Sequence, residues 1–302
     1  MKKVILITIN FHSEEETHGC LDSLKNIDIS GLQFEIIVVD NGSIKKFILS
    51  QDEQKRKIQI IRNDNNLGFS GGNNVGILKA LSEHPDYLVL LNNDTYVDKE
   101  FLQELIKTAE SNGKIGLVSP KIYFAKGSEY HKDRYQTNDL GHVFWYAGGK
   151  TDWQNVGSVH RGMDEVDNGQ YNNEEEVQFA TGCCMLLSMR VLEKIKGFDE
   201  KYFLYFEDAD LNERVKKAGY IIFYAPKSIV WHINAASSGV GSKLHDYFLT
   251  RNRLLFGFTY APLRTKFALF RESIRLLFTG REWQKIGIQD YYTKRFGKGR
   301  YR

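Results

Sequence analysis

The sequence predicts an α/β fold in which helices flank a mostly parallel sheet, followed by a helical extension that is basic and aromatic. Apolar runs rich in Val, Ile and Leu alternate with amphipathic segments, and such runs are typical of strands that are buried on both faces of a parallel sheet. The charge distribution sets the extension apart. Residues 243–302 contain 14 Lys and Arg against 4 Asp and Glu, a net charge of +10, whereas the preceding residues contain 27 against 34, a net charge of −7. We therefore expect a domain over residues 1–240 and an extension over 241–302.

The first half of the chain is expected to alternate between strands and helices. Ser13 stands three residues before Glu16, a capping-box spacing that predicts a helix over 13–27. A glycine-rich loop after residue 64 leads into a second helix, and a third helix begins near Asp98. Buried strands are expected at 2–10, 34–39, 58–64 and 87–91.

The second half of the chain is less regular. Residues 121–176 are rich in Gly, His, Tyr, Trp and acidic residues, and we expect them to form long surface loops. A strand and a helix follow over 177–195. A further helix ends at Gly219, because glycine favours a helix C-terminus, and short strands are expected over 220–226 and 228–232.

The composition is that of an ordinary globular protein, with 42% hydrophobic and 26% charged residues. No apolar run approaches the ~20 residues of a transmembrane helix, and no secretory signal is recognisable, so we expect a cytoplasmic protein. The cysteines, Cys20, Cys183 and Cys184, have the spacing of neither a disulfide framework nor a zinc site. We interpret the adjacent pair as small buried hydrophobic residues.

Polar residues stand at the end of every predicted strand of the first half. Asn10 ends the first strand, and Asp40 and Asn41 follow the second. Asn66 follows the third strand, and Asn92-Asn93-Asp94 follows the fourth. Because ligands of parallel α/β sheets bind at the carboxyl ends of the strands, this coincidence predicts a ligand site at that edge.

Two common nucleotide-binding motifs are absent from the sequence. The first strand is followed by NFHSEEE rather than G-x-G-x-x-G, and no P-loop sequence occurs. The segment Asn92-Asn93-Asp94 fits a turn and a Mg²⁺ or Mn²⁺ site on a diphosphate equally well. His232, which closes the last predicted strand, is relevant only if Asp94 binds a metal.

Two interpretations are open for the acidic residues Glu207, Asp208 and Asp210. Acidic residues in the first turn of a helix stabilise its dipole, and Asp210 can pair with Arg214 four residues later. However, Glu207 and Asp208 follow the aromatic run YFLYF, which would hold at least one of them in an apolar wall. A carboxylate held in this way is a candidate general base.

Seven segments together resemble the inverting glycosyltransferases of family 2, which have the GT-A fold. They occur in the order and spacing of that family over residues 3–235, and the closest likeness is to bacterial rhamnosyltransferase-like members that build surface polysaccharides of the cell envelope. The segments are ITINFHSEE, IIVVDNGS, NLGFSGGNNVG, LVLLNNDTYVD, FATGCCMLLS, GFDEKYFLYFEDADLNERVKKAGY and IVWH.

The resemblance implies a role for each matching residue. Asp94 would bind a divalent metal, Mn²⁺ or Mg²⁺, and His232 would complete the metal site. In the family's motif the first position is acidic, whereas here it is the amide Asn92. Asp208, with Glu207 beside it, would be the catalytic base. The nucleotide sugar would contact Thr8, Asn10, Asp40, Asn41, Asn66, Gly68, Phe69, Asn73, Asn93, Asp94 and Gly182.

The resemblance also implies the substrates. The leading donor is dTDP-rhamnose, with a UDP-sugar as the alternative, and the acceptor is a glycan or a polyprenyl-linked sugar. Residues 121–176 would shape the acceptor pocket, with Trp145, Trp153 and His160 as the residues named within it.

Three other functions are weighed against this one. A sugar-nucleotide pyrophosphorylase needs a glycine-rich, basic loop where NFHSEEE stands, and a non-catalytic nucleotide-sugar-binding module would not need Glu207 and Asp208. A nucleic-acid partner is not expected, because no recognition motif accompanies the basic extension.

The extension contains a helix with an apolar face edged by arginines. Its apolar residues are Phe267, Phe270, Ile274, Leu277 and Phe278, and the arginines are Arg264, Arg271 and Arg275. This face either packs on the preceding domain or contacts the anionic inner face of the plasma membrane.

Overall fold

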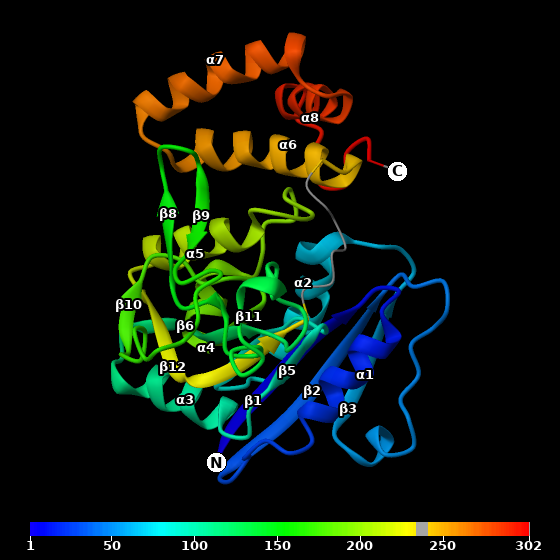
Figure 1. Cartoon of the computed structure of the whole chain (residues 1–302). Coiled ribbons are helices and arrows are strands. Elements are labelled where there is room, and N and C mark those ends of the chain that lie inside the picture. The colour runs from blue at the N-terminus through cyan, green and yellow to red at the C-terminus, as the bar shows by residue number, and fades with distance from the viewer. Residues whose placement is uncertain (234–240, 302) are drawn as a thin grey trace.

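The computed structural model describes residues 1–233 and 241–301 (Figure 1). One large mixed sheet lies at its centre in the strand order β10-β12-β6-β11-β4-β1-β2-β3, while β5 pairs with β12 and β7 pairs with β6. A separate hairpin joins β8 and β9. The strands are β1 Lys2–Asn10, β2 Leu32–Asn41, β3 Ile58–Asn63, β4 Tyr87–Leu91, β5 Thr95–Val97, β6 Ile115–Phe124, β7 Phe144–Tyr146, β8 Gly149–Asp152, β9 Gly157–His160, β10 Glu175–Val177, β11 Cys184–Ser188 and β12 Ile221–His232.

Helices cover the sheet and form a further layer at the C-terminal end, seen at the top of Figure 1. None of the helices in the described part of the chain combines the length and the apolar composition that a membrane span requires. The helices are α1 Glu14–Ser23, α2 Gly68–Leu81, α3 Phe101–Ser111, α4 Met189–Ile195, α5 Glu207–Lys217, α6 Lys243–Tyr260, α7 Leu263–Thr279 and α8 Glu282–Tyr292.

The predicted α/β class with a mostly parallel sheet is confirmed. β1 lies between β2 and β4 and is parallel to both, and β2 is parallel to β3. β11 is antiparallel to β4 and to β6. The carboxyl ends of β1, β2 and β4 therefore meet at one edge, as the polar strand ends predict.

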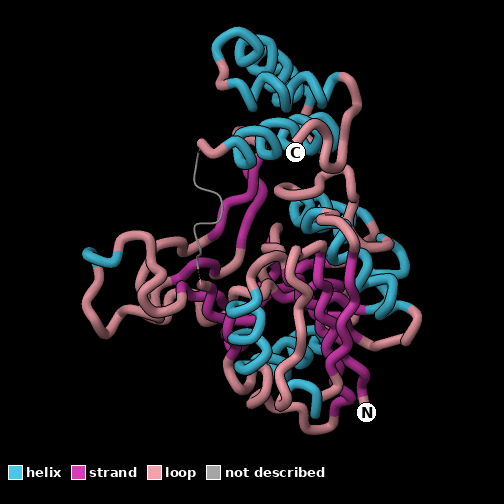
Figure 2. The backbone as a smooth tube through the Cα atoms, turned by 90° about the vertical axis from the view of Figure 1, so that its right-hand side faces the viewer, coloured by secondary structure: helices cyan, strands magenta, loops and turns pink. Residues whose placement is uncertain are grey.

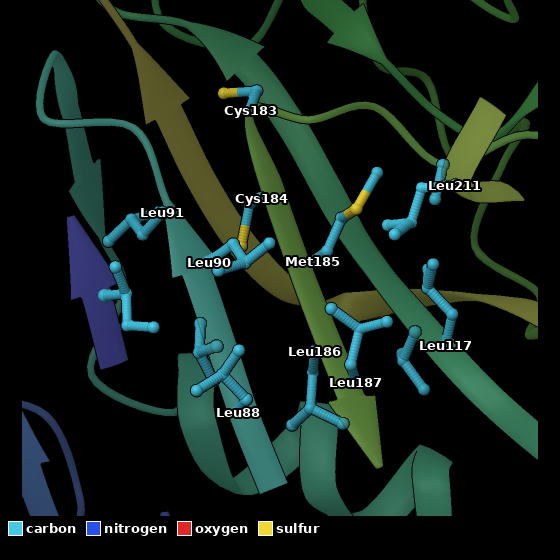
Figure 3. Close-up of a cluster of buried hydrophobic side chains, with 14 of the residues drawn as sticks. Leu88, Leu90, Leu91, Leu117, Cys183, Cys184, Met185, Leu186, Leu187 and Leu211 are labelled. Atoms are coloured by element: carbon cyan, nitrogen blue, oxygen red, sulfur yellow. The ribbon is translucent and has the colours of Figure 1, made fainter. Parts of the chain in front are cut away.

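The apolar strands pack as the sequence predicts. Figure 3 shows leucines of β4 and β6 side by side with Met185 and Leu187 of β11. Cys183 and Cys184 are buried beside them as free thiols, which confirms the interpretation of this pair as small core residues.

The prediction of long surface loops over 121–176 is partly wrong. β6 extends to Phe124 and is buried along its whole length, and β7, β8, β9 and β10 also lie in this segment. The strand was not predicted because Pro120 and Lys121 interrupt its apolar pattern in the sequence. Pro120 pairs with Ala225 beside a register shift of β12, and the buried Lys121 ammonium bonds to the Asp167 carboxylate at 2.7 Å.

Two local predictions also need correction. The expected short strands over 220–226 and 228–232 are one strand, β12, with that register shift inside it. The predicted capping box does not form, because the Ser13 side chain makes no cap hydrogen bond and its hydroxyl accepts from the Asn93 amide at 2.7 Å. Gly219 does follow the end of α5 in a left-handed conformation.

Three helices make up the predicted extension. In Figures 1 and 2, α6, α7 and α8 lie beyond the end of the sheet at which the β8–β9 hairpin projects. The predicted boundary between 1–240 and 241–302 falls beside residues 234–240, which lie outside the described residues, so the division into two domains stays a prediction.

Candidate functional site

A buried polar network lies at the carboxyl ends of β1 and β2. The Asn10 amide donates to Asp40 Oδ1 and to Ser43 Oγ, both at 3.1 Å. Burial raises the pKa of Asp40, but hydrogen bonds from Ser43, from the Phe47 amide and from Asn10, together with the Arg62 guanidinium, bring the pKa below its ordinary value. Asp40 is therefore ionised and fixed in place.

A cavity of about 480 Å³ opens at the same edge of the sheet. Thr8, Asn10 and Asp40 are fully buried and are not part of its wall. The other residues predicted to bind a nucleotide sugar all line it: Asn41, Asn66, Gly68, Phe69, Asn73, Asn93, Asp94 and Gly182.

Several lining residues were not predicted from the sequence. They are Ile9, Phe11, His12, Ser13, Glu16, Leu90, Leu91, Phe203, Leu204 and Leu244. Asn92 also lines the cavity and belongs to the predicted polar strand end. Phe11 and His12 directly follow the polar strand end at Asn10, so their position in the chain was a usable signal. Leu244 gives no such signal, because α6 reaches the cavity from a distant part of the sequence.

The start of α2 forms one wall of the cavity through a close backbone contact. Gly68 has φ +75°, and a Cβ there would lie 2.4 Å from the Phe203 carbonyl oxygen. That carbonyl accepts from the Phe69 amide at 2.7 Å, while the Asn66 and Asn41 side chains hold the Gly68 amide and carbonyl. Only glycine fits here, which gives the glycine-rich loop a structural requirement.

Asp94 and His232, the two residues named for the metal, lie beside each other. His232 Nε2 lies 3.3 Å from Asp94 Oδ2, because β12 ends at His232 where it pairs with the start of β5. Asp94 Oδ1 and His232 Nδ1 are both buried and have no hydrogen-bond partner among the residues that the structure describes. Within residues 1–233 and 241–301, no third His, Cys, Asp or Glu joins them.

Asp94 and His232 together fit a divalent ion whose remaining coordination positions are filled by a bound substrate or by water. A carboxylate oxygen and an imidazole nitrogen can both bind Mn²⁺. A buried carboxylate oxygen that has no hydrogen bond within the described part of the chain, such as Asp94 Oδ1, lowers the stability of the fold unless a ligand binds it. Two protein ligands leave most positions of a six-coordinate ion open to water or to phosphate oxygens.

The residues predicted for the acceptor separate into two places. Trp145 stacks edge-on against both His160 and His232, with ring centroids 4.6 Å apart in each case. Burial lowers the pKa of His160 to about 4, so this imidazole is neutral near pH 7. Trp153 lies elsewhere, with its ring stacked on Phe256 of α6.

Glu207 and Asp208 form the wall of a second cavity, of about 360 Å³. They lie in the first turn of α5, where Asp208 Oδ2 accepts from the Gly182 amide at 3.0 Å and Oδ1 from the Ala209 amide at 2.8 Å. Gly182 itself lines the first cavity, so Asp208 stands between the two cavities. His160 is also part of the second wall.

The two carboxyl groups differ in their environment. Burial, with a further contribution from the nearby Asp208, raises the pKa of Glu207 well above its ordinary value. Burial also raises the pKa of Asp208, but the amides of Gly182 and Ala209 oppose that rise. Asp208 is therefore the group of this pair that loses its proton more readily.

A model of one protein family matches residues 4–196, and its description is glycosyl transferase family 2. The chain belongs to glycosyl transferase family 2. A solved structure agrees with the GT-A fold expected of that family: GalNAc-T7 with UDP, GalNAc and Mn²⁺ superposes with a TM-score of 0.62 at 14% identity, over 92% of this chain and 58% of that one.

Two curated relatives resemble this chain in sequence. A low-salt glycan biosynthesis hexosyltransferase, Agl10 of Haloferax volcanii, is 28% identical over 70% of this chain and 61% of its own length, so the chain spans less than two thirds of that relative. An N-acetylglucosaminyl-diphospho-decaprenol L-rhamnosyltransferase of Mycobacterium tuberculosis is 24% identical over 76% of this chain and 78% of its own length.

Proposed function

We propose that this chain is an inverting, metal-dependent glycosyltransferase that moves a sugar from a nucleotide sugar to a lipid-linked glycan acceptor in surface polysaccharide synthesis. One observation carries the proposal. Asp208 Oδ2 accepts from the Gly182 amide, so that Asp208 stands between the cavity that contains Asp94 and the cavity that contains Glu207. A transferase needs a base between its donor and acceptor sites, whereas a nucleotide-sugar-binding module needs neither the base nor the second cavity.

The reaction follows from this arrangement. Asp208 takes the proton of an acceptor hydroxyl, whose oxygen forms a bond to the anomeric carbon of the donor sugar from the opposite side to the diphosphate. The bond between the anomeric carbon and the diphosphate oxygen breaks, and the nucleoside diphosphate leaves with the electron pair. A single displacement of this kind inverts the anomeric carbon.

Asp94 and His232 would hold a divalent metal, Mn²⁺ or Mg²⁺. Bound there, the ion offsets the negative charge of the leaving diphosphate as a Lewis acid. The side chains around it do the rest of the binding: Asn41, Asn66 and Asn73 supply hydrogen-bonding groups to the nucleotide, and Phe69 and Phe11 supply apolar surface.

The donor and acceptor are proposed from the relatives. The mycobacterial relative is named for transfer of L-rhamnose to N-acetylglucosaminyl-diphospho-decaprenol, so we favour dTDP-rhamnose as donor and a polyprenyl-diphosphate sugar as acceptor. A UDP-sugar is the alternative. Trp145 and His160 are proposed to contact the acceptor. Trp153 is proposed to act through the packing of the β8–β9 hairpin.

Purified protein tests the proposal directly. It is incubated with Mn²⁺, a short-chain N-acetylglucosaminyl-diphospho-polyprenol and either dTDP-rhamnose or a UDP-sugar, and the product is followed by mass spectrometry and NMR of the new anomeric centre. We expect transfer with inversion from one donor. Binding of donors without transfer to any acceptor would support the binding module instead.

The apolar face of α7 supports a peripheral membrane location on the cytoplasmic side. Leu263, Phe267 and Phe278 are 84%, 64% and 78% exposed, and Phe270 and Ile274 are exposed beside them. These five residues form the apolar face of α7, and Arg264, Arg271 and Arg275 are exposed along its edge. Leu277, which was predicted on this face, is instead half-buried against the core. An apolar stripe edged by arginines matches an anionic lipid surface, where each arginine adds about 1 kcal/mol.

Vesicle sedimentation tests this location. The double variant Phe267→Ser/Phe278→Ser should lose binding to vesicles that contain anionic phospholipid, and 0.5 M salt should weaken the wild type. The double variant Ile44→Ser/Ile48→Ser is the matched control, because both isoleucines are exposed on another surface. Equal binding by both double variants would remove α7 from the membrane contact.

A further inference from the structure

The loop that leads into Asp208 has an unfavourable backbone. Phe203, Tyr205 and Phe206 have φ values of 63°, 68° and 71°. Residues with a Cβ rarely adopt this left-handed region, and three of them within four positions form a strained segment that persists only where the surroundings impose it. Glu207 and Asp208 follow at once, so the strain lies directly before the proposed base.

Two adjacent side chains of α6 impose that conformation. Arg251 and Asn252 are completely buried. The Asn252 amide donates to the carbonyl oxygens of Tyr202, Leu204 and Tyr205 at 2.7, 2.8 and 2.9 Å. Every carbonyl oxygen that it holds belongs to the strained loop.

Arg251 binds the start of the same loop and also the C-terminal segment. Its Nη2 donates to the carbonyl oxygens of Lys201 and Tyr202, each at 3.1 Å. Its Nη1 donates to the Gly297 carbonyl at 2.7 Å, and its Nε donates to Asn252 Oδ1 at 2.9 Å. A buried guanidinium is costly unless its donors are used, and here it uses them on the loop, on Asn252 and on the C-terminal segment.

The loop serves both cavities. Its Phe203 carbonyl accepts from the Phe69 amide at the start of α2, and Phe203 lines the cavity of Asp94. Tyr205 and Phe206 line the cavity of Asp208. A displacement of the loop would therefore move the wall of the proposed donor site and the base together.

We infer that Arg251 and Asn252 are positioning residues, through which the C-terminal helices hold the loop 201–206 and thereby set both the donor wall and Asp208. The inference rests on the proposed role of Asp208. In this inference α6 acts on the active site through the loop 201–206, and Arg251 and Asn252 do not contact the substrate.

The test compares two variants of buried polar residues of α6, Asn252 and Asp246. Asn252→Ala removes the three bonds to the loop. Asp246→Asn weakens the ion pair between the buried Asp246 carboxylate and the exposed Arg281 guanidinium, which joins α6 to the start of α8. Melting temperature, kcat and the KM for the donor are measured for both, together with Asp208→Asn.

We expect Asn252→Ala to lower kcat on the order of 10²-fold, because small misplacements of catalytic groups have effects of that size, and to raise the donor KM severalfold. Asp246→Asn should lower the melting temperature with both constants near wild type. A purely structural role for Asn252 predicts a lower melting temperature alone, with an unchanged KM, and that result would overturn the inference.

Two further outcomes are distinguishable. If Asn252→Ala does not fold, Arg251→Lys decides, because it keeps the charge but cannot span the carbonyls of Lys201, Tyr202 and Gly297. Unchanged kcat and KM in that variant overturn the inference. If Asp208→Asn is fully active, the assignment of Asp208 as the base fails, and the inference that rests on it fails too. An inactive Asp208→Asn beside a fully active Asn252→Ala refutes only the positioning role.

Discussion

Replacing Asp208 with asparagine separates the proposed base from its neighbours most sharply. The asparagine keeps the size of the side chain and one acceptor oxygen, but its NH₂ group must face one of the two amides, of Gly182 or Ala209, that now donate to the carboxylate. Leaving one buried amide without an acceptor costs about 1–3 kcal/mol of stability. The variant should therefore fold with a lowered melting temperature.

The effect on the rate should be much larger. Loss of a general base typically lowers the rate by ~10²–10⁴-fold, which corresponds to about 3–5 kcal/mol of transition-state stabilisation. Asp208 is not among the residues that line the cavity of Asp94, so the affinity for a nucleoside diphosphate should stay within about threefold. Single-turnover transfer at saturating donor measures the first quantity, and calorimetric titration measures the second.

Glu207→Gln is the matched control. Burial raises the pKa of Glu207 well above its ordinary value and so favours the protonated form, and glutamine has the shape and neutrality of a protonated glutamate. We therefore expect its transfer rate to remain within a few-fold of wild type. A near wild-type rate for Asp208→Asn, or equal losses for both variants, would refute the assignment of the base and return attention to Glu207 and Asp210.

The remaining predictions concern the metal, the α2 wall and pH. Excess chelator should abolish transfer, and Asp94→Ala should do so with the fold intact, while His232→Ala should be milder because Asp94 and the diphosphate remain; full activity in chelator would contradict the metal site. Gly68→Ala should weaken donor binding about tenfold by calorimetry, since its Cβ would meet the Phe203 carbonyl at 2.4 Å, whereas Gly113→Ala, with open space around it, should not. Glu207→Gln should gain melting temperature over wild type as pH rises from 4 to 8. The raised pKa keeps the Glu207 proton bound in the folded state after the unfolded state has lost it, so this group makes the wild type less stable with increasing pH. A constant difference in melting temperature would contradict that pKa shift.

The parts of the site that could be predicted are those that a local sequence pattern reveals, in which polar residues directly follow an apolar strand. Asn41, Asn66 and Asp94 follow strands that apolar runs reveal, and parallel pairing brings those strand ends together. The pairing of Asp94 with His232 needed the resemblance, because 138 positions separate them and no local pattern joins them.

The parts that could not be predicted depend on contacts between distant segments. Leu244, Arg251 and Asn252 lie on α6, whose sequence mixes apolar, basic and uncharged polar residues with one acidic residue and shows no recognisable motif. Their roles follow from the packing of α6 against the loop 201–206. In the same way, Lys121 makes the end of β6 look like a loop in the sequence, because a lysine is buried in a strand only when it has a partner such as Asp167.

The contact between the β8–β9 hairpin and the C-terminal helices limits how this protein can be recombined with its relatives. The Trp153 ring stacks on Phe256 of α6, the Trp153 carbonyl accepts from Thr265 of α7, and Arg253 of α6 donates to the Asn155 carbonyl. A chimera that exchanges residues 243–301 alone would place a foreign helix surface under a native hairpin tip. Exchange of residues 149–160 together with the helices preserves the matched surfaces, so the two segments have to be exchanged together although about 80 residues separate them in the chain.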